Sequence, residues 1–144
     1  MSDRFATTLT FGGVVQRADL DRLVELSADA DYEPVFRDGE TVEVYDGQGS
    51  YETFGELRQW LRAHNLPYRW QEEAKYEYDG IVEVWFPGME HPREQTSTAD
   101  GSAVVQVDGL KHWLDKGRTL ADVVAEFEPF LRELPPLRLR GDVS

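Results

Sequence analysis

Apolar and polar residues alternate over two neighbouring stretches in the middle of the chain, between residues 69 and 87. Both stretches are rich in the β-branched and aromatic residues that favour strands, and Asp79-Gly80 between them is a turn signal. A two-residue turn there would mix apolar and charged side chains on both faces. A three-residue turn that ends with Gly80 in the left-handed conformation separates the faces and matches opposite charges. The pattern therefore predicts a β-hairpin in which Tyr76 lies opposite Val82.

This register gives the hairpin an apolar face and a charged face. The apolar face carries Ala74, Tyr76, Val82, Val84 and Phe86, and the charged face carries Glu73, Lys75, Glu77, Ile81, Glu83 and Trp85. Because a hairpin alone is marginal in water, its apolar face must pack against helices or further strands. Trp85 is expected to stand among charges on the partly solvated face of the sheet. Two interpretations of this tryptophan remain open: packing in the core, or anchoring a partner protein.

Similar patterns predict the remaining elements. Strands are expected at 5–11, 34–36, 41–45 and 103–107, and helices at 17–28, 50–64, 110–114 and 119–134. Thr119 and Asp122 have the spacing of a capping box, and Pro129 should break the last helix. Residues 88–101 are expected to form an exposed loop, and the tail at 137–140 either an edge strand or a frayed end.

The order of these elements indicates one domain. Strands and helices follow each other without the regular βαβ pattern of a parallel sheet, over a length of 144 residues. We predict a single acidic α+β domain, 1–144, with a mostly antiparallel sheet of about four to five strands and two to three helices packed on one face.

The net charge of −13 is unevenly distributed along the chain. Residues 19–56 contain twelve acidic and two basic residues, so this segment carries −10. Such a field repels nucleic acid and anionic membranes and attracts basic protein surfaces. An acidic surface can also serve only to keep a small protein in solution.

Cysteine is absent, which excludes disulfides, thiol nucleophiles and thiolate metal sites. No apolar run is long enough for a membrane span, and the first residues lack the apolar core of a signal peptide. We therefore expect a soluble, cytoplasmic protein.

The sequence contains no strong catalytic or cofactor motif. Gly12-Gly13 follows a predicted strand, but neither a dinucleotide fingerprint nor a P-loop surrounds it. His64, His91 and His112 lack the spacing of a metal site. We expect neither a cofactor nor a metal, and an enzyme is less favoured than a binding protein.

Three hypotheses of function remain. The first is a non-enzymatic binding domain that presents carboxylates to a basic partner, in its sharpest form by imitating a nucleic-acid backbone and inhibiting a nucleic-acid-handling protein. Its partner-binding residues would be Asp19, Asp21, Glu25, Asp29, Asp31, Glu33, Tyr78 and Trp85. The second is a small-molecule-binding domain or enzyme with a pocket near the loop at 88–101. The third is a homo-oligomeric assembly subunit that associates through a sheet edge or through Trp85.

Overall fold

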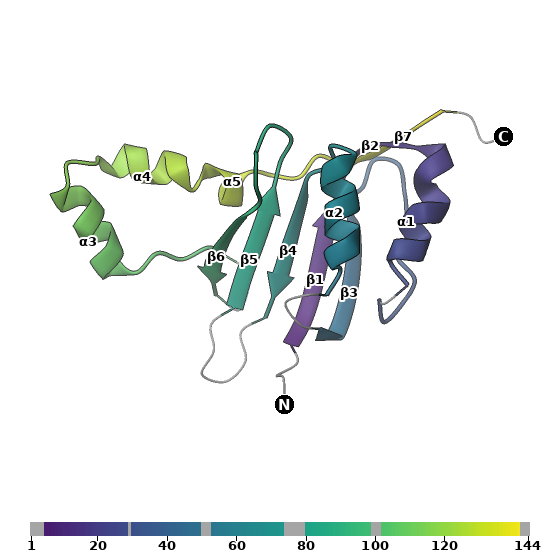
Figure 1. Cartoon of the computed structure of the whole chain (residues 1–144), viewed down its shortest axis with the longest axis horizontal. Coiled ribbons are helices and arrows are strands. Elements are labelled where there is room, and N and C mark those ends of the chain that lie inside the picture. Colours follow the sequence, from purple (N-terminus) through teal and green to yellow (C-terminus); the bar gives the residue numbers. More distant parts are fainter. Residues whose placement is uncertain (1–4, 29, 50–52, 74–79, 99–101, 142–144) are drawn as a thin grey trace.

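A five-stranded sheet, antiparallel throughout, forms the centre of the protein in this computed structural model (Figure 1). The structure describes residues 5–28, 30–49, 53–73, 80–98 and 102–141. In sheet order the strands are β3 (Val42–Gly49), β1 (Phe5–Phe11), β4 (Tyr68–Glu72), β5 (Gly80–Trp85) and β6 (Arg93–Ser97). The predicted α+β class and the mostly antiparallel sheet are confirmed.

A second, two-stranded sheet joins the two ends of the chain. Its strands are β2 (Gly13–Gln16) and β7 (Leu137–Arg140), which run parallel. The tail is therefore a strand and not a frayed end. Leu137 is fully buried in the main core, which fastens the end of the chain to the first strands.

Gly12 and Gly13 are required where the chain crosses the segment that precedes β7. A Cβ atom on Gly12 would lie 1.8 Å from the carbonyl oxygen of Pro135. Gly13 has a φ of +107°, a conformation that other residues rarely adopt. Close packing therefore explains Gly12 and backbone conformation explains Gly13, without a role in phosphate binding.

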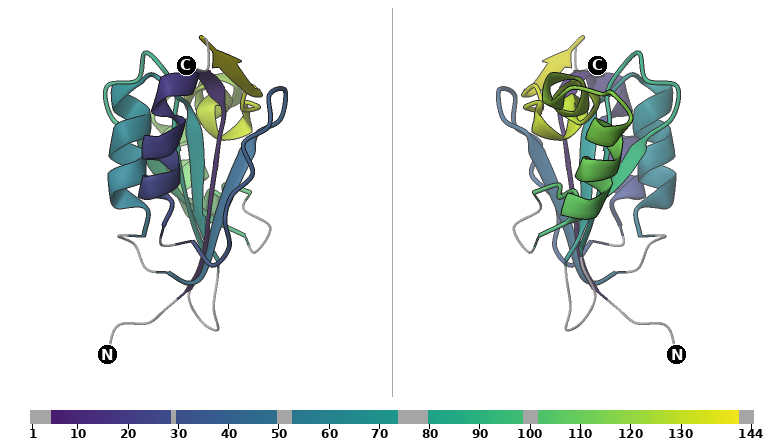
Figure 2. Two further views of the ribbon diagram at one scale, coloured as in Figure 1. Left: turned by 90° about the vertical axis from the view of Figure 1, so that its right-hand side faces the viewer. Right: turned by 90° about the vertical axis from the view of Figure 1, so that its left-hand side faces the viewer.

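Two helices, α1 (Leu20–Leu26) and α2 (Gly55–Ala63), cover one face of the sheet (Figure 2). A short 3-10 turn, Arg17–Asp19, leads into α1. On the opposite face the short helix α5 (Glu128–Leu131) places Phe130 against Val82, Val84 and Phe86. The helices α3 (Val107–Asp115) and α4 (Leu120–Glu126) extend beyond β6, away from the sheet (Figure 1).

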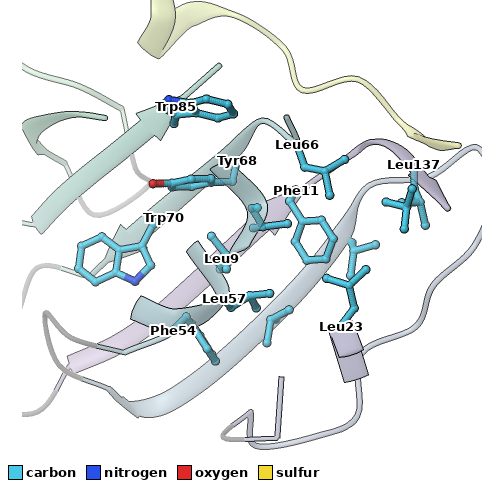
Figure 3. Close-up of a cluster of buried hydrophobic side chains, with 14 residues drawn as sticks. Leu9, Phe11, Leu23, Phe54, Leu57, Leu66, Tyr68, Trp70, Trp85 and Leu137 are labelled. Carbon is cyan, nitrogen blue, oxygen red and sulfur yellow. The ribbon is translucent and has the colours of Figure 1, made fainter. Parts of the chain in front are cut away.

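The main core lies between the sheet and the pair α1 and α2 (Figure 3). Alternate residues of the strands face it, as period-two patterning requires. The strands contribute Leu9, Phe11, Val42, Val44, Tyr68, Trp70 and Trp85, and the helices and connections contribute Leu23, Phe54, Leu57, Leu61 and Leu66. Burial of these side chains is the largest favourable contribution to folding.

The predicted hairpin forms, but its predicted register is wrong. Tyr68 pairs with Trp85, and Val82 pairs with Gln71 rather than with Tyr76. The first strand therefore ends at Glu72, and the connection between β4 and β5 is longer than a three-residue turn. Residues 74–79, which include the first two residues of the predicted turn, lie outside the described residues, and Gly80 is the first residue of β5.

The prediction that one face of the hairpin is solvated is also wrong for β5. This strand lies between β4 and β6 and is covered on both faces. Val82 and Val84 face α5, whereas Glu83 and Trp85 face the main core and are 6% and 5% exposed. A strand in the middle of a covered sheet needs no polar face, and the glutamate in its pattern is neutralised inside the core.

Three further predictions are wrong locally. Residues 93–97, inside the expected loop, form the edge strand β6, whose polar composition gives no strand signal. Residues 34–36 are irregular. The expected strand at 103–107 is reduced to one bridge between Ser97 and Ala103, and Val107 already begins α3.

The predicted capping box and the break at Pro129 are confirmed. The Thr119 hydroxyl accepts a hydrogen bond from the Asp122 amide at 3.1 Å, and the Asp122 carboxylate accepts one from the Thr119 amide at 3.0 Å. Helix α4 ends at Glu126, and Pro129 lies in the first turn of α5, where its missing amide proton costs nothing.

We predict that Gly12→Ala destabilises the protein by about 1–3 kcal/mol, because the new methyl group can fit only if two backbone segments separate. Thermal unfolding measures the effect. Gly55→Ala is the matched control, since no atom beyond its chain neighbours and its own helix backbone lies within 4 Å of its Cβ position. Equal melting temperatures for the two variants would contradict the claim that the backbone at Pro135 leaves no room for a side chain at position 12.

Candidate functional site

Exposed carboxylates surround the β3 edge of the sheet. We call this region the acidic surface, and it comprises Asp21, Glu25, Asp31, Glu33, Asp38, Glu40 and Glu43. It runs from α1 through the irregular segment that follows to β3, which lie together at one end of the molecule (Figure 1). Across residues 19–56, eight of the ten described acidic residues are exposed, so almost all of this charge faces solvent.

Basic residues offset little of this charge. Arg22 lies 3.0 Å from Glu25, within one face of α1, and both side chains are mostly exposed. Arg138 of β7 lies 3.8 Å from Asp38. Exposed pairs of this kind contribute little to stability because water and salt screen them. The acidic surface therefore keeps a strong negative field.

Two of the carboxylates also hold the backbone that carries the others. Asp31 accepts a hydrogen bond from the Gly47 amide at 2.9 Å, and Asp38 accepts one from the Leu139 amide at 2.8 Å. These bonds fasten the irregular segment to β3 and to β7. Segments without regular structure need such side-chain partners to hold one conformation.

Of the predicted partner-binding residues, Asp21, Glu25, Asp31 and Glu33 belong to the acidic surface. Asp19 is half-buried in the 3-10 turn before α1. Asp29 and Tyr78 lie outside the described residues.

The expected exposure of Trp85 is wrong. Its indole packs beside Tyr68 in the main core and donates a hydrogen bond to the Met89 carbonyl at 3.1 Å (Figure 3). The expectation failed because α2 covers the face of β5 that the alternation of charges had marked as solvated. Trp85 therefore offers neither a surface anchor nor a route to assembly.

The sequence analysis missed an aromatic side chain on the acidic surface. Tyr32 is 57% exposed and stacks on Tyr45, with the ring centroids 6.0 Å apart. Stacking holds the ring in place, and exposed tyrosines are frequent anchors of protein interfaces. Tyr32 lies in an irregular segment without periodicity, so only its position between Asp31 and Glu33 could have marked it.

A second group of charges lies inside the core, beneath α2. Arg58 of α2 and Glu83 of β5 form a salt bridge of 3.1 Å, with side chains 8% and 7% exposed. The Tyr68 hydroxyl donates to the same Glu83 oxygen at 2.8 Å and accepts from Arg62 at 2.5 Å. The guanidinium of Arg58 also stacks over Trp70, 4.4 Å from the ring centroid. We call these residues the buried cluster.

The electrostatics of the buried cluster favour a structural role. Burial and the adjacent Glu83 carboxylate raise the pKa of Tyr68, so the phenol stays protonated and donates its hydrogen bond. Glu83 has Arg58 and Tyr68 as partners. The polar cavity beside α2, of about 420 Å³, is lined by Asp46, Thr53 and Glu56 but not by Glu83. The buried cluster thus joins α2 to the sheet.

Glu72 lies near the buried cluster and is 9% exposed. Burial raises the pKa of its carboxyl, the nearby Glu94 carboxylate raises it further, and Arg58 partly offsets both effects. Its Oε2 atom is buried and has no hydrogen-bond partner among the described residues. The charged form of Glu72 is therefore a cost to the folded state.

The histidines do not assemble a site. His64 stacks on Trp60 at the end of α2, and its Nδ1 lies 2.9 Å from the Trp60 carbonyl, as expected for a helix end. His91 and His112 are exposed, and neither lines the polar cavity beside α2 or the apolar pocket described below. Within the described ranges, no three potential ligands gather to hold a metal ion.

Comparison of the chain with protein-family models, with curated proteins and with solved structures found no significant match. Among the helices of the described residues, none is both long and apolar enough to cross a membrane.

We predict that Glu83→Gln destabilises the protein by about 3 kcal/mol or more, since it removes the carboxylate with which Arg58 forms its buried salt bridge. The double variant Arg58→Met with Glu83→Leu should lose less stability than the single one, because it removes both charges. Chemical denaturation measures both changes. The control Asp115→Asn breaks the exposed Lys111–Asp115 pair and should change stability by less than about 0.5 kcal/mol. A Glu83→Gln effect as small as this control would contradict a buried pair.

We predict that Glu72→Gln stabilises the protein at neutral pH and has no effect in acid. A carboxyl whose folded pKa is raised contributes stability below its unfolded pKa, and this contribution is lost as the pH rises through the folded pKa. Glutamine, which stays neutral, avoids that loss. Unfolding free energies of the two proteins, measured from pH 3 upward, should coincide at low pH and diverge above about pH 4, the ordinary glutamate pKa. A variant that is less stable at pH 7 would contradict this account.

Proposed function

We propose that the protein is a non-enzymatic binding domain that docks a basic partner protein on its acidic surface. The observation that carries this proposal is the acidic surface itself, seven exposed carboxylates at one end of the molecule with few basic residues among them. Like charges held together repel one another and destabilise the fold. A partner that brings arginine and lysine side chains relieves this repulsion.

The partner that fits best is a protein that handles nucleic acid. Arginine and lysine bind carboxylates and phosphates through the same charge-assisted hydrogen bonds, so a row of carboxylates can occupy a groove built for a phosphate backbone. The hydrogen bonds of Asp31 and Asp38 support this role, because they hold the irregular segment in one conformation. A preorganised surface loses less entropy on binding.

Tyr32 gives the surface more than charge. Its exposed ring, between Asp31 and Glu33, offers an apolar contact that salt does not screen. Aromatic side chains inside a polar rim commonly carry a large share of binding energy. Carboxylates would then determine the rate of association and the choice of partner, and Tyr32 would slow dissociation.

We predict that reversing three charges, Asp21→Lys, Glu25→Lys and Glu33→Lys, abolishes capture of this partner and leaves the melting temperature nearly unchanged. All three side chains are exposed, and none of them is used to hold the backbone. The immobilised chain is incubated with a cell lysate at low salt, and bound proteins are identified by mass spectrometry. The partner should be a basic nucleic-acid-handling protein that is released at high salt.

The matched control reverses three exposed acids elsewhere, Glu90→Lys, Asp108→Lys and Glu133→Lys, with the same change in net charge. This control should retain capture. The purified partner should also lose its bound DNA or RNA when the chain is added, and Tyr32→Ala should weaken this displacement. Equal loss of capture in both triple variants would show that net charge alone, and not the acidic surface, binds the partner. A partner that keeps its nucleic acid when the chain is added would contradict mimicry of a nucleic-acid backbone.

A further inference from the structure

The helices α3 and α4 leave apolar side chains in water at the end of the molecule opposite the acidic surface. We call these two helices and the turn between them, residues 107–126, the arm. Figure 1 shows the arm beyond β6, whereas α1 and β3 lie at the other end of the sheet. Nine large apolar side chains are exposed among the described residues, and four of them belong to the arm: Val107, Leu114, Leu120 and Val124.

An apolar pocket of about 240 Å³ opens between the arm and α5. Its walls include Leu110, Leu120, Val123, Val124, Phe127 and Leu131. Leu131, just beyond the arm, is 71% exposed. Leu120, Val124 and Leu131 are both walls of the pocket and exposed side chains, so the pocket continues into an exposed apolar area. Exposed apolar areas of this kind are typical of interaction sites.

The arm is weakly supported by its own chain. Helix α3 has no buried residue, and a helix of nine residues is marginal in water without tertiary contacts. It is held to α4 mainly by Trp113, whose ring lies 5.9 Å from that of Phe127 and beneath the guanidinium of Arg118. A partner that covers the arm would therefore stabilise its structure as well as bury its apolar surface.

We propose that the arm is a dimerisation surface that packs against the arm of a second copy of this chain. Charge supports this choice of occupant. Residues 107–126 contain three bases and four acids, a net charge of −1 out of −13 for the whole chain. The Lys111–Asp115 and Arg118–Glu126 salt bridges pair four of these seven charges within the arm. A strongly charged partner gains little here, whereas the arm of a second copy, itself nearly neutral, adds little repulsion at the contact.

Shape supports the same occupant. A two-fold interface needs one surface that offers both a hollow and projections. The arm has both, since Val107 and Leu114 lie outside the lining of the pocket. A small apolar molecule in the pocket would leave those two side chains in water. Arm-to-arm contact covers them and keeps the two acidic surfaces far apart.

Sedimentation equilibrium of the unmodified chain tests this proposal. The mass is expected to rise with concentration from the 16.5 kDa of one chain to twice that value. Higher salt should strengthen the association, because it screens repulsion between the two acidic chains while apolar contacts persist. This response is opposite to that of the acidic surface, so the two interactions can fail independently. A mass of one chain at every concentration and salt would overturn the proposal.

Variants locate the interface. Leu120→Glu and Val124→Glu, tested separately, should each keep the mass at that of one chain, because they place a charge in the contact. Val35→Glu is the matched control: Val35 is 60% exposed, near the acidic surface, and adds the same charge. Circular dichroism checks that each variant is folded. A dimer lost equally in the control, or retained in both arm variants, would place the interface elsewhere and overturn the proposal.

Discussion

The cost of removing charge from water determines how this molecule is arranged. A chain with 28 acidic and 15 basic residues must solvate most of its carboxylates. The acids between α1 and β3 lie around one edge of the sheet, where water covers them. The core keeps Glu83 because Arg58 neutralises its charge and Tyr68 donates a hydrogen bond to it. Exposed apolar side chains gather at the opposite end, on α3 and α4, where acidic and basic residues nearly balance. The sheet, covered on one face by α1 and α2, lies between the acidic surface and the apolar arm.

Patterning along the sequence predicted the strands and helices better than it predicted which of them pack against each other. The α+β class, the strand at 5–11, the capping box at Thr119 and the break at Pro129 all follow from local rules. Register and burial do not, because they depend on which element covers which face. The alternation around Glu83 reads as a solvated face, yet α2 brings Arg58 over it. The polar strand β6 has no apolar pattern at all, and it forms because β5 offers it an edge.

The candidate site was predicted in part for the same reason. Exposed carboxylates need no tertiary information, so Asp21, Glu25, Asp31 and Glu33 were placed on the surface correctly. The aromatic side chain of this surface was predicted wrongly. Trp85 was selected for its charged neighbours in sequence, whereas the exposed ring on the acidic surface is Tyr32, in a segment without periodicity. The arm was missed because helical stripes at Leu120 and Val124 normally indicate a core. Only the position of the helices beyond β6 shows that Leu120 and Val124 stay exposed.

Amide hydrogen exchange of the chain, free and bound to its captured basic partner, shows which surface the partner covers. The partner should slow exchange between residues 21 and 45, which carry the acidic surface and Tyr32, while the arm changes little at a fixed dimer content. Protection confined to residues 107–131, with the acidic surface exchanging as fast as in the free chain, would contradict the claim that charge selects the partner.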